Sequence, residues 1–206
     1  MRAAIQSIVR ATPAWPIYPL GMIPILWLYY LGLTGSLGVE PVEVIEHRLG
    51  LWGLWLLLAG LTITPLMRHA RINLIKYRRA IGVMAFVYIL VHLLTWAILD
   101  VQSLDRVWAD IVKRPYITVG MAGFALMLPL ALTSNNWSVR RLGSAAWKRL
   151  HWLVYPTVLL GAVHFVMLAK GFQLEPLLYL AGTVVLLGFR VPWQRFRLFS
   201  FRQAAQ

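Results

Sequence analysis

Residues 150–169 read LHWLVYPTVLLGAVHFVMLA, a stretch long and apolar enough to cross a lipid bilayer as a helix. The stretch carries two histidines, His151 and His164, thirteen residues apart. At about 1.5 Å of rise per residue this separation is about 20 Å, most of the hydrocarbon thickness. Ionisable side chains are costly inside a membrane, and imidazole is a common haem-iron ligand. The spacing therefore suggests a metal site near each face of a bilayer.

The composition favours a membrane protein over a soluble domain. Hydrophobic residues make up 60% of the 206-residue chain and charged residues 13%, against about 25% charged in a typical soluble domain. The lack of cysteine excludes disulfides, cysteine-ligated clusters and covalently attached c-type haem, so any haem would be bound non-covalently. The net charge is +13, and the basic residues that produce it lie between the apolar runs. Membrane topology explains charges in these positions, so they do not call for a nucleic-acid partner.

Six apolar runs predict an all-α membrane protein, a bundle of six transmembrane helices that forms a single domain over residues 1–206. The expected spans are residues 16–33, 51–66, 80–99, 116–133, 150–169 and 176–189. The second and sixth runs are short, so we expect these helices to extend into the flanking residues.

The charged residues predict the orientation of the spans. Fifteen of the twenty basic residues fall at the termini and in the loops after the second and fourth spans: Arg2, Arg10, Arg68, Arg71, Lys76, Arg78, Arg79, Arg140, Arg141, Lys148, Arg149, Arg190, Arg195, Arg197 and Arg202. The seven acids fall in the alternate segments: Glu40, Glu43, Glu46, Asp100, Asp105, Asp110 and Glu175. By the positive-inside rule, both termini are expected to be cytoplasmic.

This orientation assigns a depth to each histidine within a span. His92 and His164 both fall in the outer halves of their spans, so the two should share a depth. Two histidines at one depth on two helices are what bis-imidazole ligation of haem requires. His151 lies near the cytoplasmic end, rotated about 220° from His164 on an ideal helix. The two share a face only if the helix kinks or unwinds near Pro156.

Each histidine also has a structural interpretation. His92 and His164 could form hydrogen bonds across helices, and His151 could be an interfacial residue beside a basic segment. For His47 an interfacial role is expected, and for His69 a solvated role in a basic turn.

Three arginines are candidates for contacts with anionic groups. Arg114 opens the fourth span and could pair with a haem propionate, or serve as a cap and membrane anchor. Arg78 and Arg79 could hold a flavin phosphate, although the positive-inside signal explains them more simply.

Short motifs follow one another along nearly the whole chain. They are IEH at residues 45–47, TPL at 64–66 with Arg68, HL at 92–93, LD at 99–100, RPYITVG at 114–120, LTS at 132–134, WKRLH at 147–151 with Tyr155, and His164. In this order and spacing, within six spans, the set resembles the MsrQ family (formerly YedZ) of the ferric-reductase-like transmembrane group.

The resemblance implies a haem-b-containing electron-transfer subunit of the methionine sulfoxide reductase system in the bacterial inner membrane. Electrons would come from the quinone pool or a cytosolic flavin reductase. They would pass to MsrP, a periplasmic molybdopterin enzyme that repairs oxidised periplasmic proteins. FMN is also associated with the family. The haem ligands of the family correspond to His92, His151 and His164, which implies one haem b or two.

The chain departs from the ferric reductases and NADPH oxidases, which carry two histidines on the third span. Here the third span offers only His92, and Asp105 and Arg106 stand thirteen and fourteen residues further on. A second haem at His151 would need a partner from elsewhere, and His69 has a suitable depth.

Two other functions stay open at the level of the sequence. One is a small membrane transporter or channel gated by histidines, and the other is a structural membrane subunit without a cofactor. The interiors of the spans contain no acids, which counts against a transporter that relays protons through carboxylates.

Overall fold

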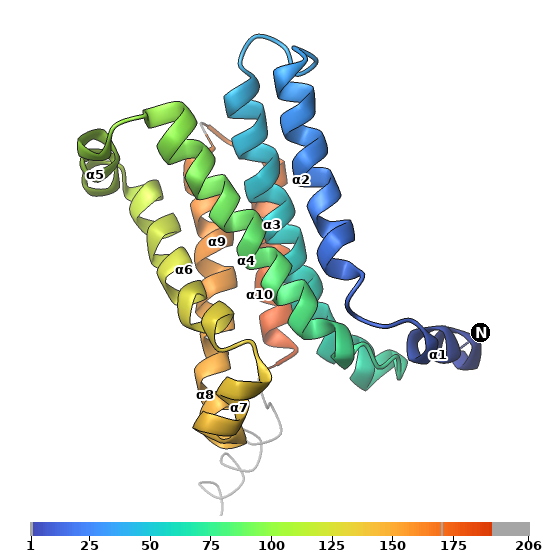
Figure 1. Ribbon diagram of the computed structural model, residues 1–206. Coiled ribbons are helices and arrows are strands. Elements are labelled where there is room, and N and C mark those ends of the chain that lie inside the picture. The colour runs from blue at the N-terminus through green and yellow to red at the C-terminus, as the bar shows by residue number, and fades with distance from the viewer. Residues whose placement is uncertain (1, 170, 191–206) are drawn as a thin grey trace, which may run out of the picture.

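The computed structural model describes residues 2–169 and 171–190, and over these residues it is helical without strands. Its main helices are α2 (Ile17–Leu33), α3 (Pro41–Pro65), α4 (Arg78–Leu94), α6 (Pro115–Leu132), α9 (Val154–Leu168) and α10 (Leu174–Gly188), which run side by side as a bundle (Figure 1). Of the basic residues that predicted the orientation, Arg195, Arg197 and Arg202 lie outside the described residues.

The apolar character of the bundle is that of a membrane protein. Four helical stretches are long and apolar enough to cross a bilayer: Pro41–Ala70, Ile75–Val101, Pro115–Leu132 and Ser144–Leu168. The helices α2 and α10 are apolar but shorter. An all-α membrane protein is therefore confirmed, while the six spans and the cytoplasmic termini stay predictions.

The second expected span begins earlier than its apolar run. The apolar run covers residues 51–66, whereas α3 starts at Pro41, so the more polar residues before the run are already helical. Proline suits the first turn of a helix because its fixed φ is helical and its missing N–H would have no helical partner there. Glu43 in the same turn is favoured by the helix dipole.

Three of the long stretches change their winding beside a histidine. A π-helical segment, η1 (Leu66–Ala70), contains His69, and a second, η3 (Thr95–Val101), begins three residues after His92. A 3₁₀ turn, η4 (His151–Leu153), precedes α9. Pro156 explains this turn, since proline lacks the N–H that an α-helix needs and its ring clashes with the carbonyl four residues earlier. The helix between His151 and His164 is thus irregular, but the 3₁₀ turn winds it more tightly than an α-helix rather than unwinding it.

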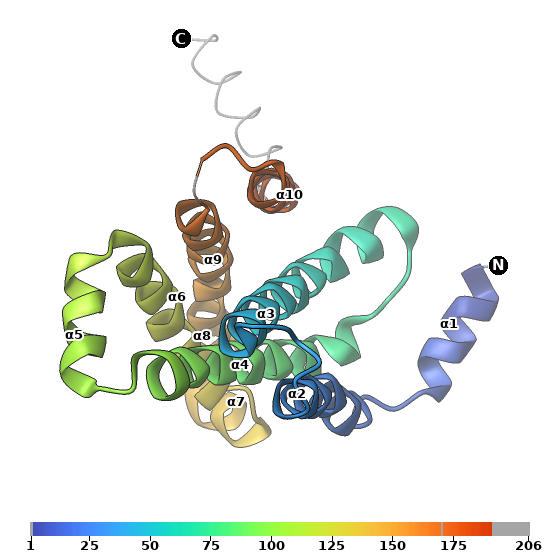
Figure 2. The same ribbon diagram turned by 90° about the horizontal axis from the view of Figure 1, so that it is seen from above.

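Short helices lie across the ends of the bundle. The helix α5 (Leu104–Lys113) lies at one edge and α1 (Arg2–Ala11) at the opposite edge, as the view from above shows (Figure 2). Two further short helices, α7 (Asn136–Leu142) and α8 (Ser144–Leu150), connect α6 to η4.

The two ends of the bundle differ in charge. The end where α3 begins and η3 finishes, which we call the acidic end, carries Glu40, Glu43, Glu46, Asp100, Asp105, Asp110 and Glu175. The opposite end, which we call the basic end, carries Arg68, Arg71, Lys76, Arg78, Arg79, Arg140, Arg141, Lys148, Arg149 and Arg190.

The helix α3 takes part in two buried clusters and so connects the rest of the bundle. In its first half, Leu49 packs with Leu28 of α2 and Met84 of α4. In its second half, Leu61 belongs to a cluster with Val158 of α9. The contact partners of α3 thus include α2, α4, α9 and α10.

A glycine on α3 permits the close approach of α4. A Cβ atom at Gly53 would lie 2.8 Å from Ile89 Cγ1, closer than real side chains approach. We expect Gly53→Ala to lower the free energy of unfolding by about 1–3 kcal/mol, because overpacking strains both helices. Gly82→Ala is the matched control on α4, since its Cβ would meet open space. Thermal unfolding in detergent measures both variants, and equal midpoints would contradict the close packing of α3 on α4.

Candidate functional site

Two histidines from separate helices lie close together in the half of the bundle nearer the acidic end. His92 belongs to the last turn of α4, and His164 lies in the second half of α9. Their ring centroids are 6.4 Å apart, and the ring planes are inclined by 74°. The structure thus brings together the two histidines that the sequence placed at one depth.

Both rings are held through the same nitrogen atom. Nδ1 of His92 donates a hydrogen bond to the carbonyl oxygen of Glu46 on α3, at 2.9 Å. Nδ1 of His164 donates to the carbonyl oxygen of Tyr116 on α6, at 2.7 Å. Because a carbonyl oxygen only accepts, Nδ1 carries the hydrogen in both rings and Nε2 keeps a free lone pair. A neutral imidazole oriented in this way by a backbone acceptor is typical of a metal ligand.

A glycine stands one helical turn after each acceptor and makes room for the ring. Gly50 follows Glu46 by four residues, and Gly120 follows Tyr116 by four. A Cβ atom at Gly50 would lie 3.2 Å from Nδ1 of His92. A Cβ atom at Gly120 would lie 2.9 Å from Nδ1 of His164. The helices α3 and α6 therefore each present a carbonyl and a glycine, which we call a histidine cradle.

These two glycines were not among the candidate site residues predicted from the sequence, although a signal for them exists. In each cradle a small residue follows the acceptor at a spacing of four, and small residues in membrane helices mark close contacts between helices. Which residue each glycine contacts is a property of the tertiary structure and could not be read from that spacing.

The spacing of the histidine pair would suit two ligands of one haem iron. Two imidazoles bound to one metal ion through nitrogens about 2 Å away place their centroids about 6 Å apart, close to the observed 6.4 Å. Within residues 2–169 and 171–190, no three or more His, Cys, Asp or Glu side chains are grouped to hold a metal ion. Two side chains do not complete the ligand shell of a free ion, whereas haem supplies four nitrogens and needs only axial ligands.

Arg114 lies next to one of the two cradles, just before α6 begins. Its guanidinium pairs with Asp110 at 3.1 Å and donates to the hydroxyl of Tyr116 at 3.3 Å. The hydrogen bond to Tyr116 raises the pKa of Arg114 above its ordinary value, and the charge of Asp110 adds to this effect. Arg114 therefore places a positive charge two residues before Tyr116, whose carbonyl oxygen accepts the hydrogen bond from His164.

His151 is held in a different way, at the basic end. The hydroxyl of Thr133 donates to the carbonyl oxygen of Pro129 at 2.6 Å, so Nε2 of His151 is the donor in its 3.2 Å bond to Thr133 Oγ1. The ring also stacks on Trp147, with centroids 3.8 Å apart. Nδ1 is then the nitrogen with the free lone pair, the reverse of the arrangement in the cradles.

The remaining two histidines contact neither the His92–His164 pair nor His151. His69, considered above as a partner for His151, is exposed and has its ring against Phe189, with centroids 5.7 Å apart. His47 is exposed near the start of α3, in keeping with an interfacial role.

The structure places Arg78 and Arg79 at the basic end, near His151. Both guanidinium groups are close enough to act on the imidazole electrostatically. Arg79 also donates to Asn136 Oδ1 at 2.7 Å, which ties the start of α4 to α7.

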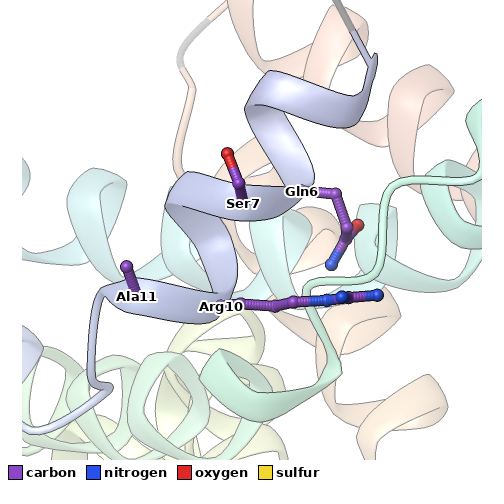
Figure 3. A pocket seen from close by; sticks show the side chains of 4 residues that line it. All are labelled: Gln6, Ser7, Arg10 and Ala11. Atoms are coloured by element: carbon purple, nitrogen blue, oxygen red, sulfur yellow. The ribbon is translucent and has the colours of Figure 1, made fainter.

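A depression in the surface lies on α1, away from the histidines. It is lined by Gln6, Ser7, Arg10 and Ala11, and the side chains of Gln6 and Arg10 point toward the segment that precedes α4 (Figure 3). Gln6 Oε1 accepts a hydrogen bond from the backbone N–H of Asn73 at 3.1 Å. Because α1 lies at the edge of the molecule (Figure 2), the depression is not part of the histidine site.

Comparison with known families places the chain. Residues 48–162 match the family described as ferric reductase like transmembrane component, and these residues include His92 and His151. No solved structure matches the chain.

Curated relatives match over most of the length. The chain is 49% identical to the protein-methionine-sulfoxide reductase heme-binding subunit MsrQ of Agrobacterium fabrum, over 88% of this chain and 86% of that protein. Proteins of the same name from Brucella ovis and Brucella canis are each 47% identical, over 96% of this chain and 93% of the relative. The chain therefore belongs to the MsrQ family, within the ferric reductase-like transmembrane proteins.

Proposed function

We propose that this chain binds haem b through His92 and His164 and acts as the electron-transfer subunit of a methionine sulfoxide reductase system. The observation that carries the proposal is the paired anchoring: two neutral imidazoles, each fixed through Nδ1 to a helix carbonyl, with centroids 6.4 Å apart. The names of the relatives, which are heme-binding subunits, support the same assignment. Haem held there supplies one-electron chemistry, and the chain supplies the ligands and their orientation.

The work of the chain itself is preorganisation. The helices α4 and α9 carry the rings, while α3 and α6 carry the carbonyls and glycines that fix them. Ligands whose rotamer and tautomer are already set lose little conformational entropy when they bind. Arg114, beside the α6 cradle, is the residue that we assign to a haem propionate.

The charges of the two ends support an orientation in the bacterial inner membrane. We place the basic end in the cytoplasm and the acidic end in the periplasm, with α2 and α10 completing six spans of one domain over residues 1–206 and both termini cytoplasmic. The histidine pair then lies in the periplasmic half. Membrane lipid would cover the exposed apolar row of α5, which is formed by Leu104, Trp108 and Val112.

This orientation assigns the partners of the chain. The acceptor at the acidic end would be an MsrP-like periplasmic molybdopterin reductase. The donor would be a quinol of the membrane or a cytosolic flavin reductase, with FMN as a second cofactor near Arg78 and Arg79. His151, at the same end as these arginines, would hold a second haem b through Nδ1.

Replacing either histidine of the pair should remove the same haem. We expect His92→Ala, His164→Ala and the double variant to lose equal amounts of the low-spin haem signal, because both rings ligate one iron. Added imidazole should restore part of the signal in the single variants, and His47→Ala is the control. Absorption spectra of the oxidised and dithionite-reduced protein measure this. Losses that add up in the double variant would show that the two rings do not share a haem.

Adding a methyl group to either cradle should displace its ring. We expect Gly120→Ala to reduce haem retention more than Gly50→Ala, because its Cβ would lie 2.9 Å rather than 3.2 Å from Nδ1. Gly123→Ala on the same helix is the control, since its Cβ would make an ordinary contact at 3.5 Å with Leu160. The haem-to-protein ratio after purification tests this order. Equal retention in the Gly120 and Gly123 variants would count against the cradle.

His151 should act independently of the pair. Its ring contacts Thr133 and Trp147, so we expect His151→Ala to leave the haem signal of the pair unchanged. Its loss of haem should add to that of His164→Ala, as for separate sites. The haem-to-protein ratios of both variants and their combination provide the measurement. Disappearance of the pair's signal in folded His151→Ala protein would refute the independence of the two sites.

A further inference from the structure

At the basic end, the side chain of Arg190 is fixed by two helices, α3 and α9, while one of its donors stays unused. Nη2 donates to the carbonyl oxygen of Leu61 on α3 at 2.8 Å, and Nη1 donates to the hydroxyl of Tyr155 on α9 at 3.2 Å. The guanidinium carbon also lies 5.4 Å from the centre of the Tyr155 ring, within the range of a cation–π contact. Nε is buried and has no hydrogen-bond partner among the described residues.

A second arginine brings another positive charge to the same place. Arg78, the first residue of α4, is close enough to Arg190 and Tyr155 to interact with both of them. Arg78 is exposed and Arg190 is half-buried, so the cluster is open on the side of Arg78. Arg79, its neighbour in the chain, is instead bonded to Asn136.

The acids of the chain are too distant to neutralise these charges. Along α3, Glu46 is fifteen residues from Leu61, and along α10, Glu175 is fifteen residues from Arg190. At about 1.5 Å of rise per residue, each separation is about 22 Å. Asp100 is further from Arg78 along α4 and η3. Two neighbouring guanidinium groups in a largely apolar bundle without a counter-charge repel each other, and a bound anion would relieve this repulsion.

We propose that Arg190, Arg78 and Tyr155 form a binding site for an oxyanion, the carboxylate or phosphate group of a ligand seated at the basic end beside His151. A guanidinium group presents a planar fork that matches two oxygens of such a group, and the unused Nε–H of Arg190 is one arm of that fork. Arg78 adds the second charge, and Tyr155 fixes the orientation of Arg190. The site lies at the opposite end of the bundle from His92 and His164, and does not rest on the haem assignment of that pair.

Three candidate ligands carry a phosphate or carboxylate group, and each is tested by its own measurement on the purified full-length protein. Flavin mononucleotide is compared with riboflavin, which lacks the phosphate, by quenching of tryptophan fluorescence. Dioleoylphosphatidylglycerol is compared with uncharged dioleoylglycerol in mixed micelles by the same signal, with both lipids brominated at their acyl double bonds so that they quench tryptophan. The haem-to-protein ratio reports a haem propionate.

The variant Arg190→Gln removes the charge and the fork. We expect at least one of the three measurements to change in this variant. Either the wild-type protein prefers the anionic probe about tenfold and the variant does not, or the variant has a lower haem-to-protein ratio. The measurement that changes identifies the source of the oxyanion. Arg141→Gln is the matched control, because Arg141 is an exposed arginine of the same end. If none of the three differs between the wild-type protein and Arg190→Gln, the site is refuted.

Two milder variants decide the question if Arg190→Gln does not fold. Arg190→Lys keeps the charge but lacks the fork, and Tyr155→Phe keeps both charges but removes the hydroxyl that orients Arg190. Each should reduce the same preference several-fold, whereas wild-type behaviour of both would overturn the proposal. The low-spin haem signal of His92 and His164 should persist in all of these variants, so that its loss marks a failure at the other site.

Discussion

Each imidazole of the histidine pair donates from Nδ1 to a carbonyl oxygen of a neighbouring helix, and the packing of four helices accommodates these two hydrogen bonds. A histidine on a membrane helix would otherwise exchange between tautomers and rotamers. The bond to Glu46 or Tyr116 leaves one tautomer and one orientation, with Nε2 free. The helices must approach closely for this, and glycines stand where they do: Gly50 and Gly53 on α3, and Gly120 on α6.

The same chain treats its two ends differently. At the acidic end, two cradles of one design hold two rings at the spacing of a shared metal. At the basic end, His151 is engaged by Thr133 and Trp147, and arginines gather without carboxylates. The first arrangement suits a cofactor held mainly by its iron, and the second suits a ligand held by its negative charge.

The sequence predicted those features that depend on local pattern. Apolar runs located the helices, and span direction placed His92 and His164 at one depth. Pro156 indicated a local irregularity of the helix, and the 3₁₀ turn η4 lies just before it. The apolar run marked only part of α3, because its polar first turns lack an apolar signal, and the expected extension reaches back to Pro41.

Other features of the site depend on tertiary contacts. The two cradles combine residues from helices far apart in sequence, and their glycines have no chemistry of their own. Arg190 counted in the sequence only as one of the charges that predict the topology, since nothing local links it to Tyr155.

Electron–nuclear double resonance on the oxidised protein, labelled with ¹⁵N-histidine, tests the shared ligation of one haem iron by two histidines most directly. We predict a haem iron coupled to two histidine nitrogens, from His92 and His164. A protein in which no iron is coupled to two histidine nitrogens would contradict it.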